Sequence, residues 1–307
     1  MKNKFLNIAY ATDDNYAMHM CMSMISVVKN YSGNEKIRFW IIYDELREEK
    51  KIKIINSLKK YDIDIKFTKI KNDYFDNVYI SGHIHKSAYF RLLLPDIVDV
   101  DKIIYLDCDL LVKKNIYELW NIDMNDKPLA AVLDLGILTS KRLMKEKYCE
   151  VGIDNERYFN SGVLVLNLKI WREYKLSQKV LDLINCHSYR HHDQDALNSI
   201  FKNNWKELPL EWNVIPPVYN MLLKIVFSKW RVEAIKAREN PAIIHYAGRY
   251  KPWNFKEYDC FNKYYYECFY ESDFKDAILP VDNDKKGKSI IRQLLRLKIA
   301  SIYKYIL

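Results

Sequence analysis

One pair of aspartates in the sequence has the spacing and surroundings of a metal site. Asp107 and Asp109 directly follow the apolar run 103–106 and precede a second apolar run at 110–112. Carboxylates at positions i and i+2 leave an extended strand on the same side, and hard oxygen ligands suit Mg²⁺ or Mn²⁺ bridging a diphosphate. Asp-x-Asp occurs four more times in the chain, but here the charges stand between apolar runs, where burial is costly without a partner. The pattern therefore predicts that Asp107 and Asp109 bind a divalent cation.

A polar segment at 245–253 contains residue types that could complete such a site. It follows the apolar run 242–244, so it is expected at the end of a strand. A lone histidine is more often a core or surface residue, but imidazole suits Mn²⁺ among other metals, so His245 is a candidate third ligand. Gly248 can let the backbone approach a phosphate, and Lys251 supplies a point charge for one.

Two other polar segments stand where a strand ends or a helix begins. Residues 11–16 admit two interpretations: a helix N-cap with acids favoured by the helix dipole, or a loop whose carboxylate and amide bind a nucleoside. Residues 191–195 open a helix, and we expect His191 and His192 to be solvated there. Asp193 and Gln194 are predicted to point from the first turn toward whatever occupies the cleft.

Short apolar runs alternate with amphipathic stretches in the first half of the chain, which predicts a parallel, doubly wound α/β sheet. Strands are expected over 5–11, 37–43, 63–70, 103–106, 129–133 and 163–166. Helices are expected over 16–31, 46–60, 170–184 and 194–201. Ligands of such sheets bind beyond the carboxyl ends of the strands, so polar residues just after strands are the first candidates for a site.

The composition of the 307-residue chain excludes several classes of protein. Hydrophobic residues make up 49% and charged residues 29%, which is ordinary for a globular enzyme and excludes a disordered or collagen-like chain. No stretch approaches the roughly 18 apolar residues of a membrane span. The sequence has no Gly-x-Gly-x-x-Gly, which counts against a nicotinamide or flavin enzyme. Its six cysteines contain no Cys-x-x-Cys pair, which is typical of a reducing cytosol.

The net charge of +9 is concentrated near the C-terminus. Residues 283–307 hold seven Lys or Arg against one Asp, a net charge of +6, which leaves +3 for residues 1–282. We therefore predict a globular domain over 1–282, a basic tail over 283–307 and no nucleic-acid partner. On a helix beginning at Ile290, the apolar residues of the tail occupy about half the circumference. An amphipathic helix on an anionic membrane surface fits this pattern best, and a helix packed on the parent domain is the alternative.

Taken in order, six motifs resemble those of the family 8 retaining glycosyltransferases of the GT-A fold, especially bacterial lipooligosaccharide α-galactosyltransferases and related glucosyltransferases. They are ATDDNY at 11–16, SAYFRL at 87–92, YLDCD at 105–109, FNSGV at 159–163, DQD at 193–195, and the 245–253 segment with His245, Gly248 and Lys251. The resemblance covers most of residues 5–255. It implies a GT-A catalytic domain over 1–282, with a Rossmann-like, doubly wound and mainly parallel α/β sheet.

The resemblance also implies a role for each matching residue. Mn²⁺, or Mg²⁺, is expected to be bound by Asp107, Asp109 and His245 and to bridge the diphosphate of UDP. The uridine is expected to contact Ala11, Thr12, Asp13 and Asn15, and the phosphates Gly248 and Lys251. The residues expected around the donor sugar are Arg91, Asn160, Asp193 and Gln194. Those expected on the donor or acceptor side are Asp134 and His83.

The activity that the resemblance implies is transfer of galactose or glucose, with retention, from a UDP-sugar to a saccharide acceptor. That acceptor would belong to a lipooligosaccharide, a glycolipid or a glycoprotein, and the enzyme would be cytoplasmic and peripheral on the inner face of the bacterial cell membrane. The uncharged amide of Gln194 is a poor nucleophile, so we expect front-face attack, with the acceptor proton leaving to the departing phosphate.

Two alternatives from other classes remain at this stage. The first is an aspartyl-phosphate phosphatase with Asp107 as nucleophile and Asp109 as acid, which usually has Thr where this chain has Leu111. The second is a non-catalytic membrane module that binds a nucleotide-sugar, against which the complete set of metal and diphosphate residues argues.

Overall fold

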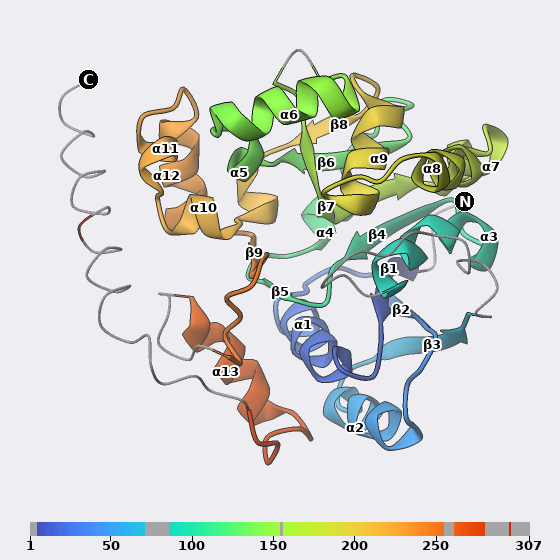
Figure 1. Ribbon diagram of the computed structural model, residues 1–307. Coiled ribbons are helices and arrows are strands. Elements are labelled where there is room, and N and C mark those ends of the chain that lie inside the picture. The colour runs from blue at the N-terminus through green and yellow to red at the C-terminus, as the bar shows by residue number, and fades with distance from the viewer. Residues whose placement is uncertain (1–4, 71–85, 154–155, 255–260, 280–294, 296–307) are drawn as a thin grey trace.

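The structure is a computed structural model that describes residues 5–70, 86–153, 156–254, 261–279 and 295 (Figure 1). The acceptor-side candidate His83 and, apart from Leu295, the predicted tail over 283–307 lie outside these residues. Within the described part of the chain, no helix is long and apolar enough to cross a membrane.

Strands and helices alternate along most of the chain. The strands are β1 Phe5–Thr12, β2 Lys36–Tyr43, β3 Ile63–Lys69, β4 Lys102–Leu106, β5 Leu110–Val112, β6 Leu129–Leu133, β7 Phe159–Asn167, β8 Lys206–Leu208 and β9 Ile243–His245. The α-helices are α1 Ala17–Lys29, α2 Glu48–Leu58, α3 Leu94–Ile97, α4 Tyr117–Trp120, α5 Leu135–Leu138, α6 Lys141–Val151, α7 Leu168–Glu173, α8 Leu176–Cys186, α9 His192–Phe201, α10 Pro216–Tyr219, α11 Leu223–Val226, α12 Arg231–Glu239 and α13 Asn262–Glu271. Two 3₁₀ helices are η2 Lys86–Leu93 and η3 Leu210–Asn213.

A seven-stranded sheet in the order β3-β2-β1-β4-β7-β6-β8 forms the centre of the structure, beside a small antiparallel pair of β5 and β9. Strands β3, β2, β1 and β4 are parallel, and β7 runs antiparallel between β4 and β6. In the view of Figure 1 the strands follow one another from β8 near the top to β3 near the bottom, with α1 to the left of them and α3 and α8 to the right, so helices lie on both sides of this sheet. The predicted doubly wound, mainly parallel α/β sheet is therefore confirmed.

Burial explains why the first strands were recognisable from their residue pattern. In β1 every residue after Phe5 is buried, as expected for a central parallel strand covered on both faces. The edge strand β3 is only partly buried along its length. Strands β2 and β3 are added on one side of β1, and β4 is added on the other side. The strand order therefore reverses between β1 and β4, and this is the switch point at which such sheets bind ligands.

One predicted helix proved to be two, and one strand was longer than expected. The predicted helix over 170–184 is divided into α7 and α8, because Lys175 adopts a left-handed conformation with φ 50°. The break contains neither Gly nor Pro, so it could not be predicted from the residue types. Strand β7 begins at Phe159 rather than at 163. It therefore includes the polar residues Asn160 and Ser161, which lie at the site rather than in the hydrophobic core.

The antiparallel direction of β7 brings its first residues to the edge where other strands end. Leu106 at the end of β4 pairs with Val163, and Leu133 at the end of β6 pairs with Phe159. The pairing register with β6 shifts between Ala131 and Val132, which leaves three residues of β7 as a bulge beside the end of β4. The polar segments after β1, β4 and β6 and at the start of β7 consequently lie along one edge of the sheet.

Candidate active site

Asp107, Asp109 and His245 form a cluster whose ligand atoms all lie within 4.8 Å of one another. The two aspartates lie in the turn between β4 and β5, and His245 is the last residue of β9. Because β9 pairs antiparallel with β5, with Leu110 opposite His245, the imidazole is brought against the aspartate turn from a distant part of the sequence. The three residues that the sequence suggested as metal ligands are thus neighbours in the structure.

A chain of amide hydrogen bonds determines which nitrogen of His245 carries the proton. The Gly162 N–H donates to Asn160 Oδ1 (3.0 Å), so that atom is an acceptor, and Asn213 Nδ2 donates to the same oxygen (2.8 Å). The oxygen of Asn213 then faces His245 Nδ1 at 2.9 Å, and Nδ1 must be the protonated nitrogen. The Nε2 lone pair of neutral His245 is left to face the aspartates.

The donor set of this cluster fits a divalent cation. His245 Nε2 lies 3.2 Å from Asp109 Oδ1 and 3.8 Å from Asp107 Oδ2. A lone pair that faces two carboxylates is repulsive unless a cation lies between them, and two carboxylates with one imidazole suit Mn²⁺ or Mg²⁺. Asn213 supplies the outer hydrogen bond that metal-binding histidines usually make.

Positively charged side chains of the protein also compensate the negative charge of the two aspartates. Lys251 Nζ donates to Asp109 Oδ2 and, at 2.8 Å, to the backbone oxygen of Tyr246. Burial would raise the pKa of Asp109, but the charge of Lys251 and its hydrogen bond to this carboxylate hold that pKa well below its usual range. Asp107 Oδ1 accepts from Arg91 Nη2 (2.9 Å) and from the Tyr105 hydroxyl (3.0 Å). Both carboxylates are therefore paired with cations of the protein, Asp109 with Lys251 and Asp107 with Arg91.

Arg91 connects the aspartate turn with the first turn of α9. Only 5% of Arg91 is exposed. Its Nε lies 3.2 Å from Asp193 Oδ2, while its Nη1 donates to the backbone oxygen of Ser161 in the β7 bulge. Burial raises the pKa of Asp193 to about 6, against the lowering effect of Arg91 and with a further contribution from Asp107. Asp193 is thus a buried carboxyl that titrates near neutrality.

Asp134, Asn160 and Gln194 form a second polar cluster at the same edge. Asp134 Oδ2 accepts from Asn160 Nδ2 and from Gln194 Nε2, both at 3.1 Å. Its other oxygen caps α5 by accepting from the Ile137 N–H (3.1 Å). Through Asn160 and Asn213 this cluster is joined to the metal-ligand histidine by continuous hydrogen bonds.

The loop after β1 has a structural role that does not exclude nucleoside binding. Asp13 Oδ1 accepts from the Tyr16 N–H (2.8 Å) at the start of α1, which is the N-cap interpretation of the sequence. The Thr12 side chain is buried and turned inward, whereas Asn15 is exposed. Cys108 Sγ donates to the backbone oxygen of Ala11 (3.1 Å), so its side chain points toward β1 and away from the metal cluster.

The segment that contributes Lys251 is fixed to the N-terminal half of the chain. Gly248 has φ 86°, a conformation that favours glycine. Further along, the Trp253 ring stacks on His19 of α1, with centroids 3.5 Å apart, and His19 Nδ1 is hydrogen-bonded to the Tyr265 hydroxyl at 2.7 Å. Helices α1 and α13 thereby hold the Lys251 loop against the aspartate turn.

We expect His19 to make the protein less stable in acid. Burial lowers its pKa to about 3 from 6.5, so the folded protein leaves His19 neutral where the unfolded chain takes up a proton. The free energy of unfolding should therefore fall as the pH decreases from about 6.5 toward 3, by at most about 1.4 kcal/mol per pH unit. Urea unfolding at several pH values should give a shallower decrease for His19→Gln; equal slopes for both proteins would contradict the prediction.

Several residues of the site carry no recognisable sequence signal. Asn213 lies in the short helix η3 and Tyr158 just before β7, and neither belongs to a spacing pattern that suggests chemistry. The predicted solvated state fits only one of the two histidines, since His191 is partly exposed but His192 is buried and within 3.0 Å of the Tyr89 hydroxyl.

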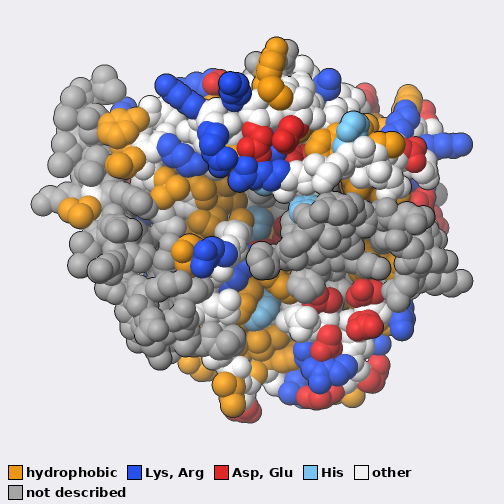
Figure 2. Space-filling view, viewed as in Figure 1, with side chains coloured by type: hydrophobic (Ala, Val, Ile, Leu, Met, Phe, Trp, Pro, Cys, Tyr) orange, Lys and Arg blue, Asp and Glu red, His pale blue; other side chains and the backbone are white. Residues whose placement is uncertain are grey.

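Figure 2 shows the face of the molecule that is turned toward the viewer in Figure 1. Histidine side chains lie in a hollow across the middle of this face, with Lys and Arg along its upper border.

A mainly parallel α/β sheet with an Asp-x-Asp turn after β4, completed by a histidine from a short antiparallel pair, is the arrangement of the GT-A glycosyltransferases. Comparison with known proteins agrees. Residues 7–257 match the model of Glycosyl transferase family 8, and the chain belongs to that family.

Curated relatives and solved structures are similar over most of the chain. General stress protein A of Bacillus subtilis is 31% identical over 82% of this chain and 89% of its own. A lipopolysaccharide 1,2-glucosyltransferase of Escherichia coli is 30% identical over 94% of this chain and 86% of its own. The galactosyltransferase LgtC, solved with donor and acceptor sugar analogues, matches with a TM-score of 0.75 and 27% identity over 87% of this chain and 96% of that chain. The bifunctional glycosyltransferase WbbM has a TM-score of 0.81 at 23% identity, which supports the fold.

Proposed function

We propose that this glycosyltransferase transfers a hexose, galactose or glucose, from a UDP-sugar to a saccharide acceptor with retention of configuration and with the help of Mn²⁺. The observation that carries the proposal is the convergence of two carboxylates and one imidazole within 4.8 Å, with Lys251 beside them. The similarity to a lipopolysaccharide glucosyltransferase and to the galactosyltransferase LgtC supports a hexose donor and an acceptor on a lipooligosaccharide, glycolipid or glycoprotein.

A cation bound by Asp107, Asp109 and His245 would neutralise charge that develops on the diphosphate leaving group. Lys251 stands beside the same aspartate turn, where it can pair with a phosphate oxygen instead of with Asp109. The loop of Ala11, Thr12, Asp13 and Asn15 at the end of β1 is proposed to hold the uridine. Gly248 lies between His245 and Lys251, is exposed, and has φ 86°, so a phosphate could approach its backbone without meeting a side chain.

The donor sugar is proposed to lie beside Arg91, Asn160, Asp193 and Gln194, with Asp134 behind them. Gln194 is an uncharged amide, its Oε1 accepts from the Ser161 N–H (3.1 Å), and its Nε2 donates to Asp134. Asp193 is paired with Arg91. Gln194 has no carboxylate, and the Asp193 carboxylate lies in an ion pair with Arg91, which supports front-face attack over a double displacement. A glycosyl adduct trapped on Asp193 or Gln194 would overturn this mechanism.

Release of UDP from a panel of UDP-sugars, with Mn²⁺, with Mg²⁺ and with EDTA, tests the proposed function. We expect Mn²⁺-dependent release from UDP-galactose or UDP-glucose, and no release from the chelated protein. Cleavage of p-nitrophenyl phosphate without UDP release would instead indicate phosphatase chemistry. Binding of the UDP-sugar without any turnover, including in the presence of acceptor saccharides, would indicate a non-catalytic module.

The basic tail is proposed to hold the enzyme on an anionic membrane surface, at the inner face of the bacterial cell membrane. Its net charge of +6 within 25 residues supports this, because each basic residue near such a surface contributes about 1 kcal/mol. Deletion of residues 283–307 should release the protein from anionic vesicles and leave hydrolysis of the UDP-sugar largely unchanged. Cosedimentation with vesicles at moderate salt measures this, and a truncated protein that still pellets would contradict it.

A further inference from the structure

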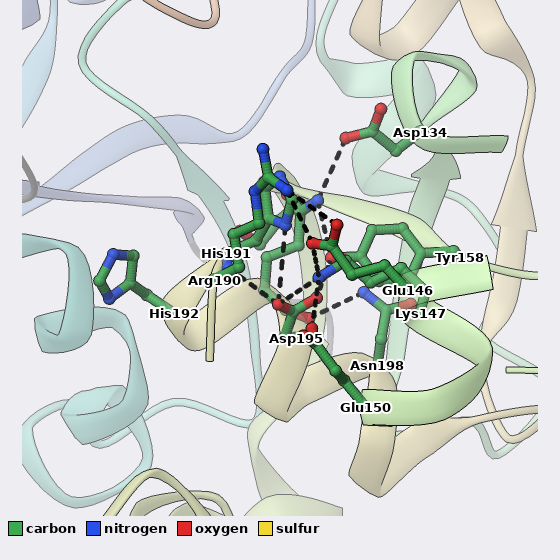
Figure 3. A network of polar contacts seen from close by, with 12 residues as sticks. Asp134, Glu146, Lys147, Glu150, Tyr158, Arg190, His191, His192, Asp195 and Asn198 are labelled. Carbon is green, nitrogen blue, oxygen red and sulfur yellow. Dashed lines mark hydrogen bonds and ion pairs between the residues drawn. The ribbon is translucent and has the colours of Figure 1, made fainter. Parts of the chain in front are cut away.

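A buried lysine outside the residues discussed above is bonded to the helix that carries Asp193 and Gln194. Lys147 of α6 is 0% exposed, as is Asp195 of α9, and Lys147 Nζ donates to Asp195 Oδ2 at 2.7 Å (Figure 3). A buried ammonium is strongly unfavourable unless it is paired and hydrogen-bonded. Glu150 on the same helix is a second, longer contact of Lys147 at 3.4 Å.

Both oxygens of Asp195 are engaged. Its Oδ1 accepts from the Tyr158 hydroxyl (2.6 Å), and its Oδ2 accepts from Lys147 and from the His191 backbone N–H (2.8 Å). Burial would raise the pKa of Asp195, but hydrogen bonds from His191, Lys147 and Tyr158 lower it to about 2. Asp195 therefore acts only as a hydrogen-bond acceptor. Its three hydrogen bonds connect α6, the residue before β7 and the start of α9.

The direction of these bonds fixes the orientation of the Gln194 amide. Since Asp195 can only accept, the single hydroxyl proton of Tyr158 is directed to it. Toward Gln194, Tyr158 can then only accept, so the NH₂ group of that amide must face the hydroxyl, which lies 3.3 Å away. The same NH₂ group donates to Asp134, and the amide oxygen accepts from the Ser161 N–H.

We propose that Lys147 is a positioning residue for the sugar transfer. Its charge keeps Asp195 an acceptor, and through the Tyr158 hydroxyl this keeps the Gln194 amide in one orientation at the donor-sugar side of the site. The inference rests on the proposed function, because Gln194 is assigned there to the donor sugar. The ion pairs of Lys147 within the described residues are with Glu146, Glu150 and Asp195, away from Asp107, Asp109 and His245, so we expect its effect to act through the geometry of α9.

Replacing Lys147 by methionine tests this with a side chain of similar length and no charge. The pKa of Asp195 should then rise, because Glu146 and Glu150 of α6 remain nearby while the lysine charge is lost. Tyr158, the His191 N–H and the His191 imidazole 3.6 Å away would still stabilise the carboxylate in part. Once Asp195 is protonated, the Tyr158 proton is no longer directed to it. We expect kcat for UDP release to fall about 10- to 100-fold, as misplaced catalytic groups do. The KM for the UDP-sugar and the Kd for Mn²⁺ should stay within about twofold of the wild type.

The pH profile separates positioning from a general loss of structure. In Lys147→Met the remaining kcat should decrease further as the pH is lowered from 8 to 6, whereas the wild type should lack this additional decrease. Lys147→Arg should recover much of the activity. Lys145→Met, the same substitution at an exposed position of α6, should behave as the wild type.

Tyr158→Phe supplies an independent variant in case Lys147→Met does not fold. It leaves the Lys147–Asp195 ion pair in place and removes only the hydroxyl that connects it to Gln194. We expect a similar decrease in kcat without the pH effect, and a double variant no worse than the more impaired single one. A Tyr158→Phe protein whose kcat equals that of the wild type, or a double variant in which the two losses add, would overturn the positioning role alone. Absence of UDP-sugar turnover in the wild-type protein would overturn the proposed function as well.

Discussion

Adding one methyl group at Gly162 is expected to reduce UDP-sugar turnover by about 100-fold or more, because it displaces two of the proposed metal ligands. A Cβ at this position would lie 2.3 Å from His245 Cε1 and 2.8 Å from Asp107 Oδ2, both closer than atoms can approach. The bulge of β7 brings the backbone of Gly162 directly behind the cluster, where its carbonyl also accepts from the Asp107 N–H (2.9 Å). His245 and Asp107 would therefore have to separate, and the lone pairs would no longer converge on one ion.

The Gly162→Ala variant should show its defect first in metal binding. We expect the Kd for Mn²⁺, measured by electron paramagnetic resonance of the free ion, to rise at least about tenfold, as it does when the surroundings of a metal ligand are disturbed. Gly152→Ala is a suitable control, since Gly152 has φ 73° at the end of α6, so alanine there strains the backbone away from the cluster. That control should lower the melting temperature and leave the Mn²⁺ affinity unchanged. Unaltered affinity in Gly162→Ala would show that His245 is not a ligand.

Asp109→Asn is expected to abolish turnover, with a decrease of about 1,000-fold or more, by removing one charged ligand of the proposed ion without changing its shape. The pKa of Asp109 is held low by Lys251, so the wild-type side chain is a carboxylate at every pH at which the enzyme would work. Its amide would leave Lys251 facing no carboxylate and would present only one weak oxygen ligand.

Thermal unfolding gives a second readout for Asp109→Asn that does not depend on activity. Mn²⁺ with UDP should raise the melting temperature of the wild type, since a ligand that binds only the folded state stabilises it. The variant should lose this increase. Asp62→Asn is the matched control, because Asp62 belongs to another Asp-x-Asp pair whose first side chain is 85% exposed and faces Lys36. An Asp109→Asn protein that is still stabilised by Mn²⁺ and UDP would contradict the ligand assignment.

The residue pattern was sufficient to predict the sheet and to select Asp107 and Asp109 from the five Asp-x-Asp pairs of the sequence. The apolar runs before Asp107 and after Asp109 became β4 and β5, whereas Asp62 lies at a solvated edge of the sheet. The reason is that burial of flanking residues is visible in the sequence, and charges placed between buried strands need a partner. His245 could be suggested as a third ligand from its residue type and its place after an apolar run, but its pairing beside this turn could not be derived, because a three-residue strand carries too little pattern.

Residues that act through other residues could not be predicted in the same way. A lysine in the run KRLMKEK is typical of a solvated helix face, and only the packing of α6 against α9 reveals that Lys147 is buried. Asn213 is one amide among many, and its importance comes from lying between His245 and Asn160. The direction of a hydrogen bond depends on neighbours that are distant in the chain, and a local pattern does not record them.

The contact between His19 and Tyr265 spans 246 positions, and it bears on how the enzyme is made. During synthesis the strands β1–β4 and the aspartate turn leave the ribosome early, and their parallel pairing can proceed as a unit. His245, Lys251 and Trp253 emerge much later, and they must close a long loop before α1 and α13 can meet. A nascent chain therefore carries the aspartates without their histidine. The proposed metal site can therefore be complete only after residues 245–253 and α13 have been synthesised, so we expect products interrupted before them to lack it.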